Sequence, residues 1–390
     1  MFQGLLVIIY LAFISLGLPD SVLGAAWPAM YTAFDVPLAF EGILSAIMAG
    51  GTIISAALSE RLTLRLGPGK VTAISVAMTA AALLGFSISN SFWLLCLWAI
   101  PYGLGAGSVD AALNNYVALH YESRHMSWLH CMWGIGTSIG PYIMSLALTG
   151  GHTWHMGYRI IGIMQIFLTA ALFISLPKWH SAPGAIPAQG EEKRKPMPLL
   201  QVIRIKGAME VFVCFFCYCA IESTVGLWAS TYMNLYKGVS AETAAGYGAL
   251  FFVGITGGRF ISGFVTRKLS DKQMIFCGQA LILLGILIVL LPLGEWMTLA
   301  GLVIMGLGCA PIYPCLIHST PAHFGADKSQ AVIGMQMAFA YVGSMGMPPL
   351  FGIIANLLNV SLMPWYLLIL LVLMVFMHLR LERVTSAASV

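Results

Sequence analysis

The sequence predicts an all-α membrane protein with twelve transmembrane helices, arranged as two six-helix bundles that are related by a parallel pseudo-repeat. Three observations support this prediction. Apolar residues make up 59% of the 390-residue chain and charged residues only 9%, whereas a soluble domain carries about 25% charge. The apolar residues fall into runs long enough to cross a bilayer. Short motifs recur about 200 residues apart, which is the mark of an internal repeat.

Each apolar run bounded by Gly, Pro or charged residues predicts one membrane span. The N-terminal six are expected at about 4–31, 41–59, 71–90, 92–119, 125–150 and 157–177. The C-terminal six are expected at about 207–235, 241–267, 272–292, 296–323, 329–357 and 359–380. Residues 178–206 are rich in Pro, Ala and charge, and predict a cytoplasmic linker between bundles at 1–177 and 207–390.

The repeat relates corresponding spans of the two halves. The matched motifs are Gly50-Gly51-Thr52-Ile53-Ile54-Ser55 with Gly257-Gly258-Arg259-Phe260-Ile261-Ser262, Gly103-Leu104-Gly105 with Gly306-Leu307-Gly308, Gly136 and Pro141 with Gly343 and Pro348, and Asp20-Ser21 with Glu222-Ser223. Every offset lies between 202 and 207 residues. Two parallel halves with a site at the midplane between them are typical of secondary transporters.

The basic residues predict the orientation. If both termini lie on one side of the membrane, that side receives all of the 19 Lys and Arg residues except Arg159, Lys237 and Arg259. This asymmetry places the termini and the linker in the cytoplasm, in an inner (plasma) membrane. The net charge of +4 therefore reflects topology, and no nucleic-acid partner is expected. No metal ion or cofactor is expected either, because the cysteines lie in apolar spans without ligand spacing.

Three acids lie deep within the spans, and we interpret Asp20, Asp110 and Glu222 as the proton-coupling set. A carboxylate near the centre of a span costs about 2.5–3.5 kcal/mol and usually marks an ion or substrate path. A desolvated carboxyl group can take up a proton near neutral pH. Asn114 follows Asp110 by one helical turn and can present its amide on the same face. Structural hydrogen bonding between helices is the alternative for all three acids, and Glu222 in particular could tie span seven to a neighbour.

Span five presents a polar and aromatic face. His130, Trp133, Thr137 and Pro141 follow a 3-4-4 spacing and share this face. A ring and an imidazole suit a sugar, whose C–H faces stack on aromatics and whose hydroxyl groups need donors and acceptors. Further substrate-binding candidates are Trp27, Trp228, Tyr313 and Gln336. Arg259 is the lone cation within span eight, close to the cytoplasmic half of that span, and we expect it to pair with a carboxylate or with carbonyls at a helix end.

These features resemble the major facilitator superfamily across nearly the whole chain. Within it, the sequence is most similar to the fucose-permease-like proton-coupled sugar symporters, whose span-four motif is Gly-Leu-Gly followed by an acid, small residues and Asn. The matching residues are Gly103, Leu104, Gly105, Asp110 and Asn114 in span four, Asp20 in span one, His130 in span five, and Glu222, Gly226 and Trp228 in span seven.

The resemblance implies a monomeric secondary transporter that imports a monosaccharide or related polyol with protons by alternating access. In this interpretation Asp20 accepts the proton and Asp110 is linked to the substrate. The partners are then the small-molecule substrate, protons and membrane lipid. The alternative is a proton-driven antiporter that exports a drug or small metabolite. An enzyme is not expected, because no phosphate loop, nucleophile motif or metal-ligand spacing accompanies the acids.

Overall fold

The computed structural model describes residues 2–37, 40–180, 195–239, 241–292 and 294–386, and every regular element in these ranges is helical. The N-terminal elements are α1 (Phe2–Asp20), α2 (Val22–Phe34), α3 (Glu41–Ala57), α4 (Ser59–Leu66), α5 (Pro68–Ser87), α6 (Phe92–His120), α7 (Ser123–Thr149) and α8 (Trp154–His180). The later elements are α9 (Leu199–Ile203), α10 (Ala208–Leu235), α11 (Ala241–Val265), α12 (Asp271–Leu290), α13 (Glu295–His318), α14 (Thr320–Phe324), α15 (Ser329–Leu357), the 3-10 helix η2 (Val360–Leu362) and α16 (Met363–Ser386).

The all-α membrane fold is confirmed. Among the described residues, 10 helices are long and apolar enough to cross a membrane, or 11 if the bent pair α3–α4 is one span. The remaining predicted span corresponds to α11, whose apolar part is Leu250–Val265. The chain bends by 58° between α3 and α4, because α4 carries the charged residues Glu60, Arg61 and Arg65 and leaves the apolar path of α3.

Two of the predicted spans are interrupted. The first span, Gly4–Phe34, breaks at Ser21, between α1 and α2. The predicted span 296–323 ends earlier, because α13 stops at His318 and the short α14 starts with Pro321 in its first turn. Proline lacks a backbone N–H and is tolerated at a helix start, where that donor has no intrahelical partner.

The chain divides into two compact units. Unit 1 comprises Met1–His120 and Leu129–Met197, and unit 2 comprises Tyr121–Trp128 and Pro198–Val390. Part of the predicted linker, 181–194, lies outside the described residues, while α9 lies within the predicted linker range. The predicted bundle boundaries at 177 and 207 stay a prediction.

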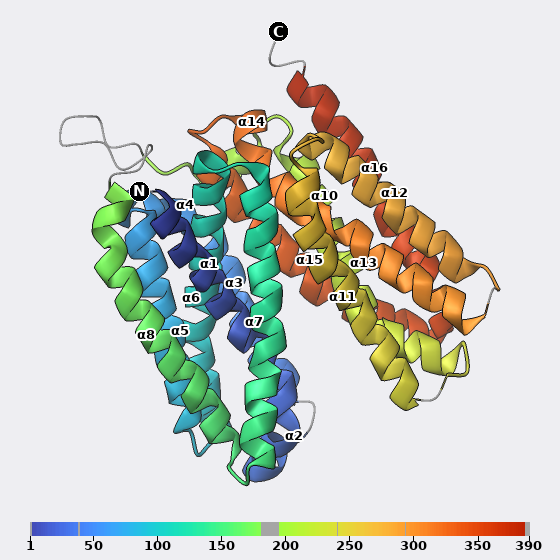
Figure 1. The fold of residues 1–390 in the computed structure, drawn as a ribbon, viewed down its shortest axis with the longest axis horizontal. Helices are drawn as coiled ribbons and strands as arrows, with labels where there is room; N and C mark the ends of the chain where they lie inside the picture. Colours follow the sequence, from blue (N-terminus) through green and yellow to red (C-terminus); the bar gives the residue numbers. More distant parts are fainter. Residues whose placement is uncertain (1, 38–39, 181–194, 240, 293, 387–390) are drawn as a thin grey trace. The chain divides into compact units, whose positions relative to one another are not determined.

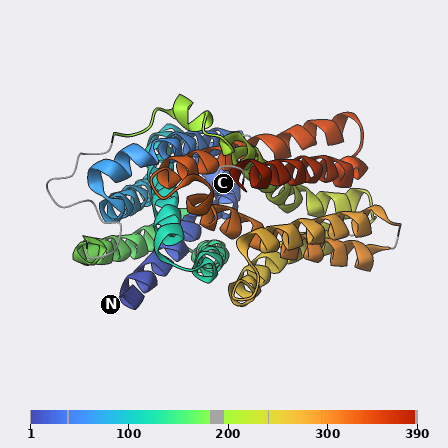
Figure 2. The ribbon, with the colours of Figure 1, turned by 90° about the horizontal axis from the view of Figure 1, so that it is seen from above.

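Packing inside each unit follows the sequence repeat. In unit 1, α3 packs on α6, and α5 packs on both α6 and α8. In unit 2, α11 packs on α13 in the same manner as α3 on α6, and α12 and α13 lie side by side in Figures 1 and 2. α10 packs on α15 and α16. The core of unit 1 contains an aromatic cluster around Trp27, Phe86, Phe92 and Tyr158.

Glycines allow the closest of these helix contacts. The Cα of Gly103 faces the carbonyl of Met48, and the Cα of Gly306 faces the carbonyl of Phe251, so a Cβ at either position would overlap that oxygen. Gly103 and Gly306 are 203 residues apart in the sequence, and so are Met48 and Phe251. The same contact relates Gly136 to the carbonyl of Ile14 in unit 1 and Gly343 to that of Phe216 in unit 2. Small residues let helix backbones approach closely in a membrane.

Candidate functional site

Asp20 lies at the break between α1 and α2, near the middle of the 31-residue span. Pro19 precedes it inside α1, and after the break the Ser21 hydroxyl donates a 2.6 Å hydrogen bond to the carbonyl of Thr137 on α7. The interruption leaves the Asp20 side chain exposed within unit 1. Discontinuous helices at mid-span are where transporters commonly place ion and substrate sites.

Two neutral donors hold the Asp20 carboxylate. The Trp133 indole Nε1 donates to Oδ2 at 2.8 Å, and the Tyr102 hydroxyl donates to Oδ1 at 3.2 Å. Trp133 belongs to α7 and Tyr102 to α6, so three spans converge on one carboxyl group. Neither donor carries a charge, so each can remain in place whether or not the carboxyl group is protonated.

A buried chain of hydrogen bonds joins α6 to α7, about one helical turn from Trp133. The Asn114 amide donates from Nδ2 to Asp110 Oδ1 at 2.7 Å, one turn earlier on α6. The His130 Nε2 on α7 lies 3.1 Å from Asn114 Oδ1. Because that oxygen accepts, the imidazole donates from Nε2. Asn114 thus links an acid and an imidazole, and all three side chains are buried.

The predicted face of α7 points into this region. His130 contacts α6 through Asn114, Trp133 contacts Asp20, and the Thr137 carbonyl receives the Ser21 hydroxyl. The Phe13 ring on α1 and the His130 ring pack nearly perpendicular to each other, with centroids 5.4 Å apart. His130, Trp133 and Thr137 are spaced by three and four residues and so share one face of α7. This face contacts α1 and α6 of the same unit.

Unit 2 contains a second polar cluster, around Glu222 on α10. The Arg259 Nη2 on α11 lies 3.5 Å from Glu222 Oε1 and donates to the Tyr218 hydroxyl at 3.4 Å. The predicted pairing of Arg259 with a carboxylate is confirmed. Arg259 is 3% exposed, and a cation so deep in a span is stabilised by such a partner. In this arrangement Glu222 ties α10 to α11.

Of the other four predicted residues, Trp27, Trp228 and Gln336 lie apart from these clusters, whereas Tyr313 borders the second one. Trp27 is buried in the core of unit 1, with its ring 6.3 Å from that of Phe92. Trp228 donates from Nε1 to the Pro348 carbonyl at 3.0 Å. Gln336 is fully buried and accepts from Thr320 at 2.9 Å.

The fourth of them, Tyr313, packs against the aromatic rings of Phe215 and Tyr218. Its hydroxyl lies 3.1 Å from the Met337 sulfur. The roles of Trp27, Trp228, Tyr313 and Gln336 in substrate binding stay predictions.

Sequence reasoning missed Tyr102 and Tyr218. Each is a phenol inside an apolar span, which is a weak signal, because tyrosines also pack in cores and at interfaces. Tyr218 had one further signal, since it precedes Glu222 by four residues and so shares its helix face. Tyr102 reaches Asp20 from a different helix, and its local sequence does not indicate that contact.

The fold and the two clusters define a polytopic helical membrane protein with two similarly built halves and buried carboxyl groups in both. A family model described as Major Facilitator Superfamily matches residues 9–295 and 211–389. The chain belongs to this superfamily and is a transporter, not an enzyme.

Solved structures of the same fold include two sugar symporters. The chain resembles the fucose transporter FucP in its outward conformation, with a TM-score of 0.75 and 15% identity over 95% of this chain and 98% of that one. It also resembles the proton:xylose symporter XylE bound to 6-bromo-6-deoxy-D-glucose, with a TM-score of 0.78 and 12% identity over 96% and 94% of the two chains. The human organic anion transporter MFSD10 gives a TM-score of 0.72 at 13% identity, over 95% and 98%.

A curated yeast protein is a relative by sequence. The chain is 21% identical over 283 residues to Bypass of stop codon protein 6 of Saccharomyces cerevisiae. The match covers 67% of this chain and 56% of the yeast protein, so the chain spans little more than half the length of that relative.

Proposed function

We propose that this transporter couples proton movement to the import of a monosaccharide or related polyol by alternating access. The observation that carries the proposal is the Asp20 carboxylate, held by Trp133 and Tyr102 beside the chain formed by Asp110, Asn114 and His130. The two sugar:proton symporters among the structures of similar fold support it.

Asp20 is the proposed proton acceptor. It is exposed within unit 1 and lies at mid-span, where a charged carboxylate is costly and a neutral one much less so. Protonation removes that cost, and deprotonation restores it. A conformational change that is favourable only for the neutral form therefore converts a proton gradient into solute movement.

Asp110, Asn114 and His130 are the proposed substrate-linked group, with Trp133 as the aromatic partner. Together they offer a carboxylate, an amide and an imidazole for hydroxyl groups, beside an indole ring whose face suits the C–H surface of a sugar. Since Trp133 also donates to Asp20, a substrate that moves the indole changes the environment of the proton acceptor. This shared residue is the proposed coupling between substrate and proton.

In unit 2, Glu222 is the proposed residue whose protonation state controls a contact between two helices. Its carboxylate stabilises the buried Arg259, 3.5 Å away. Removing one partner of a buried ion pair costs about 3–5 kcal/mol, so protonation of Glu222 weakens the link between α10 and α11. We also propose that the protein resides in the inner (plasma) membrane as a monomer, with both termini in the cytoplasm.

The test is the pH of a lightly buffered suspension of de-energised cells that express the protein, measured as each member of a sugar panel is added. External alkalinisation with one or a few sugars, lost in Asp20→Asn and in Asp110→Asn, is the expected result. Asp35→Asn is the matched control, because Asp35 follows α2 at the end of the first span. No pH change with any sugar, at confirmed expression, contradicts sugar symport. Acidification by a drug or metabolite would instead indicate the antiporter.

A further inference from the structure

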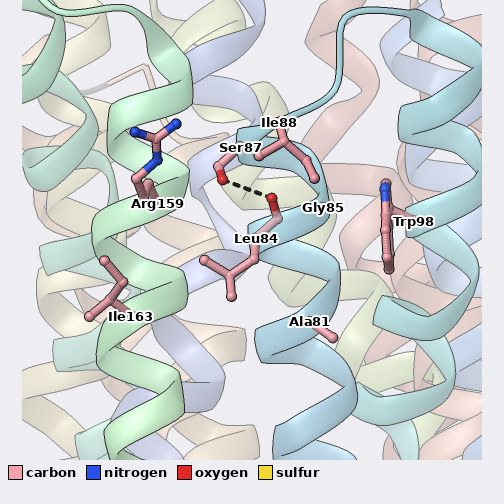
Figure 3. Close-up of a pocket in the computed structure, with 8 residues that line it drawn as sticks. All are labelled: Ala81, Leu84, Gly85, Ser87, Ile88, Trp98, Arg159 and Ile163. Atoms are coloured by element: carbon pink, nitrogen blue, oxygen red, sulfur yellow. Dashed lines mark hydrogen bonds between the residues drawn. The ribbon is translucent and has the colours of Figure 1, made fainter.

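Unit 1 has a groove along the C-terminal part of α5, with a volume of about 580 Å³. Figure 3 shows α5 between α8, which carries Arg159 and Ile163, and α6, which carries Trp98. Leu84, Ser87 and Ile88 also line the groove. The Ser87 hydroxyl donates to the Leu84 carbonyl, so the polar atom of this α5 side chain is satisfied within its own helix.

The floor of the groove is formed by small residues. Ala81 and Gly85 follow one another by one turn on α5, and the indole of Trp98 packs on Gly85 so closely that a Cβ there would overlap the ring. The neighbouring side chains are exposed and apolar, including Ile88 and Ile163. In a membrane protein such a surface faces acyl chains.

One cation lies at the mouth of this apolar groove. Arg159 is exposed on the second turn of α8, and among the residues that the structure describes it makes no ion pair or hydrogen bond. Its guanidinium lies at the level of Ser87 and Ile88, where α5 ends (Figure 3). Trp93 is exposed at the start of α6, as expected of an aromatic residue at the membrane interface. A long Arg side chain near the end of a span can extend to the lipid headgroups.

A second donor lacks a partner. The Trp98 indole Nε1–H is buried and has no hydrogen-bond acceptor among the described residues. Because this nitrogen is buried, an occupant of the groove would meet the carbon atoms of the indole ring and not its N–H. Trp98 and Arg159 line the same groove from α6 and α8, and its lining is otherwise apolar.

We propose that this groove binds one anionic phospholipid. The Arg159 guanidinium contacts the phosphate, since its planar fork suits phosphate oxygens, and an acyl chain lies along Ala81 and Gly85. Charge complementarity favours a lipid over a helix from a second copy of the chain. A phosphate group pairs with the Arg159 guanidinium, whereas an apolar helix would leave it unpaired.

The test uses the purified full-length protein in mixed micelles with phosphatidylglycerol that carries a photoreactive acyl chain. Adducts are mapped by mass spectrometry, and the same experiment is run with phosphatidylcholine of identical chains. We expect adducts on the α5 and α8 peptides with the anionic lipid. A basic residue near the surface contributes about 1 kcal/mol of attraction to anionic lipid, so Arg159→Gln should lower these adducts about fivefold while Arg159→Lys retains them.

Lys237→Gln is the matched control, because it removes a cation of unit 2 that lies over the Tyr236 ring and does not line the groove. It should leave the groove adducts unchanged. Ala81→Trp fills the floor and should abolish them for both lipids, with an unchanged elution volume. The proposal is overturned if the two lipids label equally, or if Arg159→Gln and Lys237→Gln have the same effect. It is also overturned if Ala81→Trp converts a dimer to a monomer, which would make the groove an interface between copies.

Discussion

At the scale of single residues, the two neutral donors on Asp20 give a direct prediction. Trp133→Phe and Tyr102→Phe each keep an aromatic ring but remove one hydrogen bond to the carboxylate. A hydrogen bond contributes about 1 kcal/mol, or about fivefold in a rate. We expect initial uptake rates about fivefold lower for each variant, measured with radiolabelled substrate in proteoliposomes.

The controls for these variants are the same two types of substitution at exposed positions. Trp93→Phe and Tyr142→Phe make the same substitutions at side chains that are exposed on α6 and α7. Rates equal to wild type are expected for both. If Trp133→Phe also transports at the wild-type rate, the indole donor has no part in coupling.

Asn114 is predicted to be needed for stability as well as for transport. It is fully buried and bridges Asp110 and His130, so Asn114→Leu leaves a buried acceptor and a buried donor without this partner. Each unsatisfied group costs about 1–3 kcal/mol. The midpoint of thermal unfolding in detergent should fall by several degrees, whereas Asn356→Leu, at an exposed amide on α15, should leave it unchanged. Equal midpoints for the two variants would contradict this role.

At the scale of helices, the repeated glycine contacts predict paired effects. Gly103→Ala and Gly306→Ala place a Cβ against the carbonyls of Met48 and Phe251, and overpacking of this kind costs about 1–3 kcal/mol. The chain offers matched controls in Gly50 and Gly257, where a Cβ meets no atom within 4 Å. Thermal unfolding should show destabilisation for the first pair of variants only. Destabilisation by both pairs alike would point to backbone effects in place of the close contacts.

The short helix α14 gives a pH prediction. Burial lowers the pKa of the His323 imidazole below its ordinary value, although Glu382, 3.3 Å away, opposes the shift. His378 and Lys272 also contact Glu382. Because the unfolded chain keeps the ordinary pKa near 6.5, it binds more protons than the folded protein as the pH falls through that value. The contribution of His323 to stability is therefore present above pH 6.5 and is lost below it.

His323→Gln should accordingly reduce the loss of stability between pH 7.5 and 5.5. The measurement is the thermal midpoint at a series of pH values, compared with His152→Gln, which alters an exposed histidine between α7 and α8. The His152 variant should follow the wild-type curve. A His323 variant with the wild-type slope would show that this imidazole does not titrate differently on folding.

At the scale of the whole molecule, the sequence predicts the architecture well because lipid imposes simple rules. Apolar length gives the spans, and the offset of 202 to 207 residues pairs Gly103 with Gly306 in equivalent contacts. Local spacing on one helix was equally informative. Asn114 was expected to share a face with Asp110, and the two side chains are hydrogen-bonded.

Contacts between helices were harder to predict. Arg259 was expected to find a carboxylate, but helical spacing does not indicate that the partner is Glu222 on α10. The donation from Tyr102 to Asp20 joins residues 82 positions apart. Trp27 shares a helical face with Asp20 only if the span is continuous. The break at Ser21 interrupts that span, and Trp27 packs in the core.

The central claim is that Asp20 carries the proton while Asp110 and its partners engage the substrate. The most direct measurement uses proteoliposomes that contain a pH-sensitive dye and compares substrate-driven proton entry with exchange of labelled for unlabelled substrate at equal pH on both sides. Asp20→Asn should lose proton entry at least tenfold yet retain exchange, whereas Asp110→Asn should lose both. Proton entry that persists in Asp20→Asn would contradict the account.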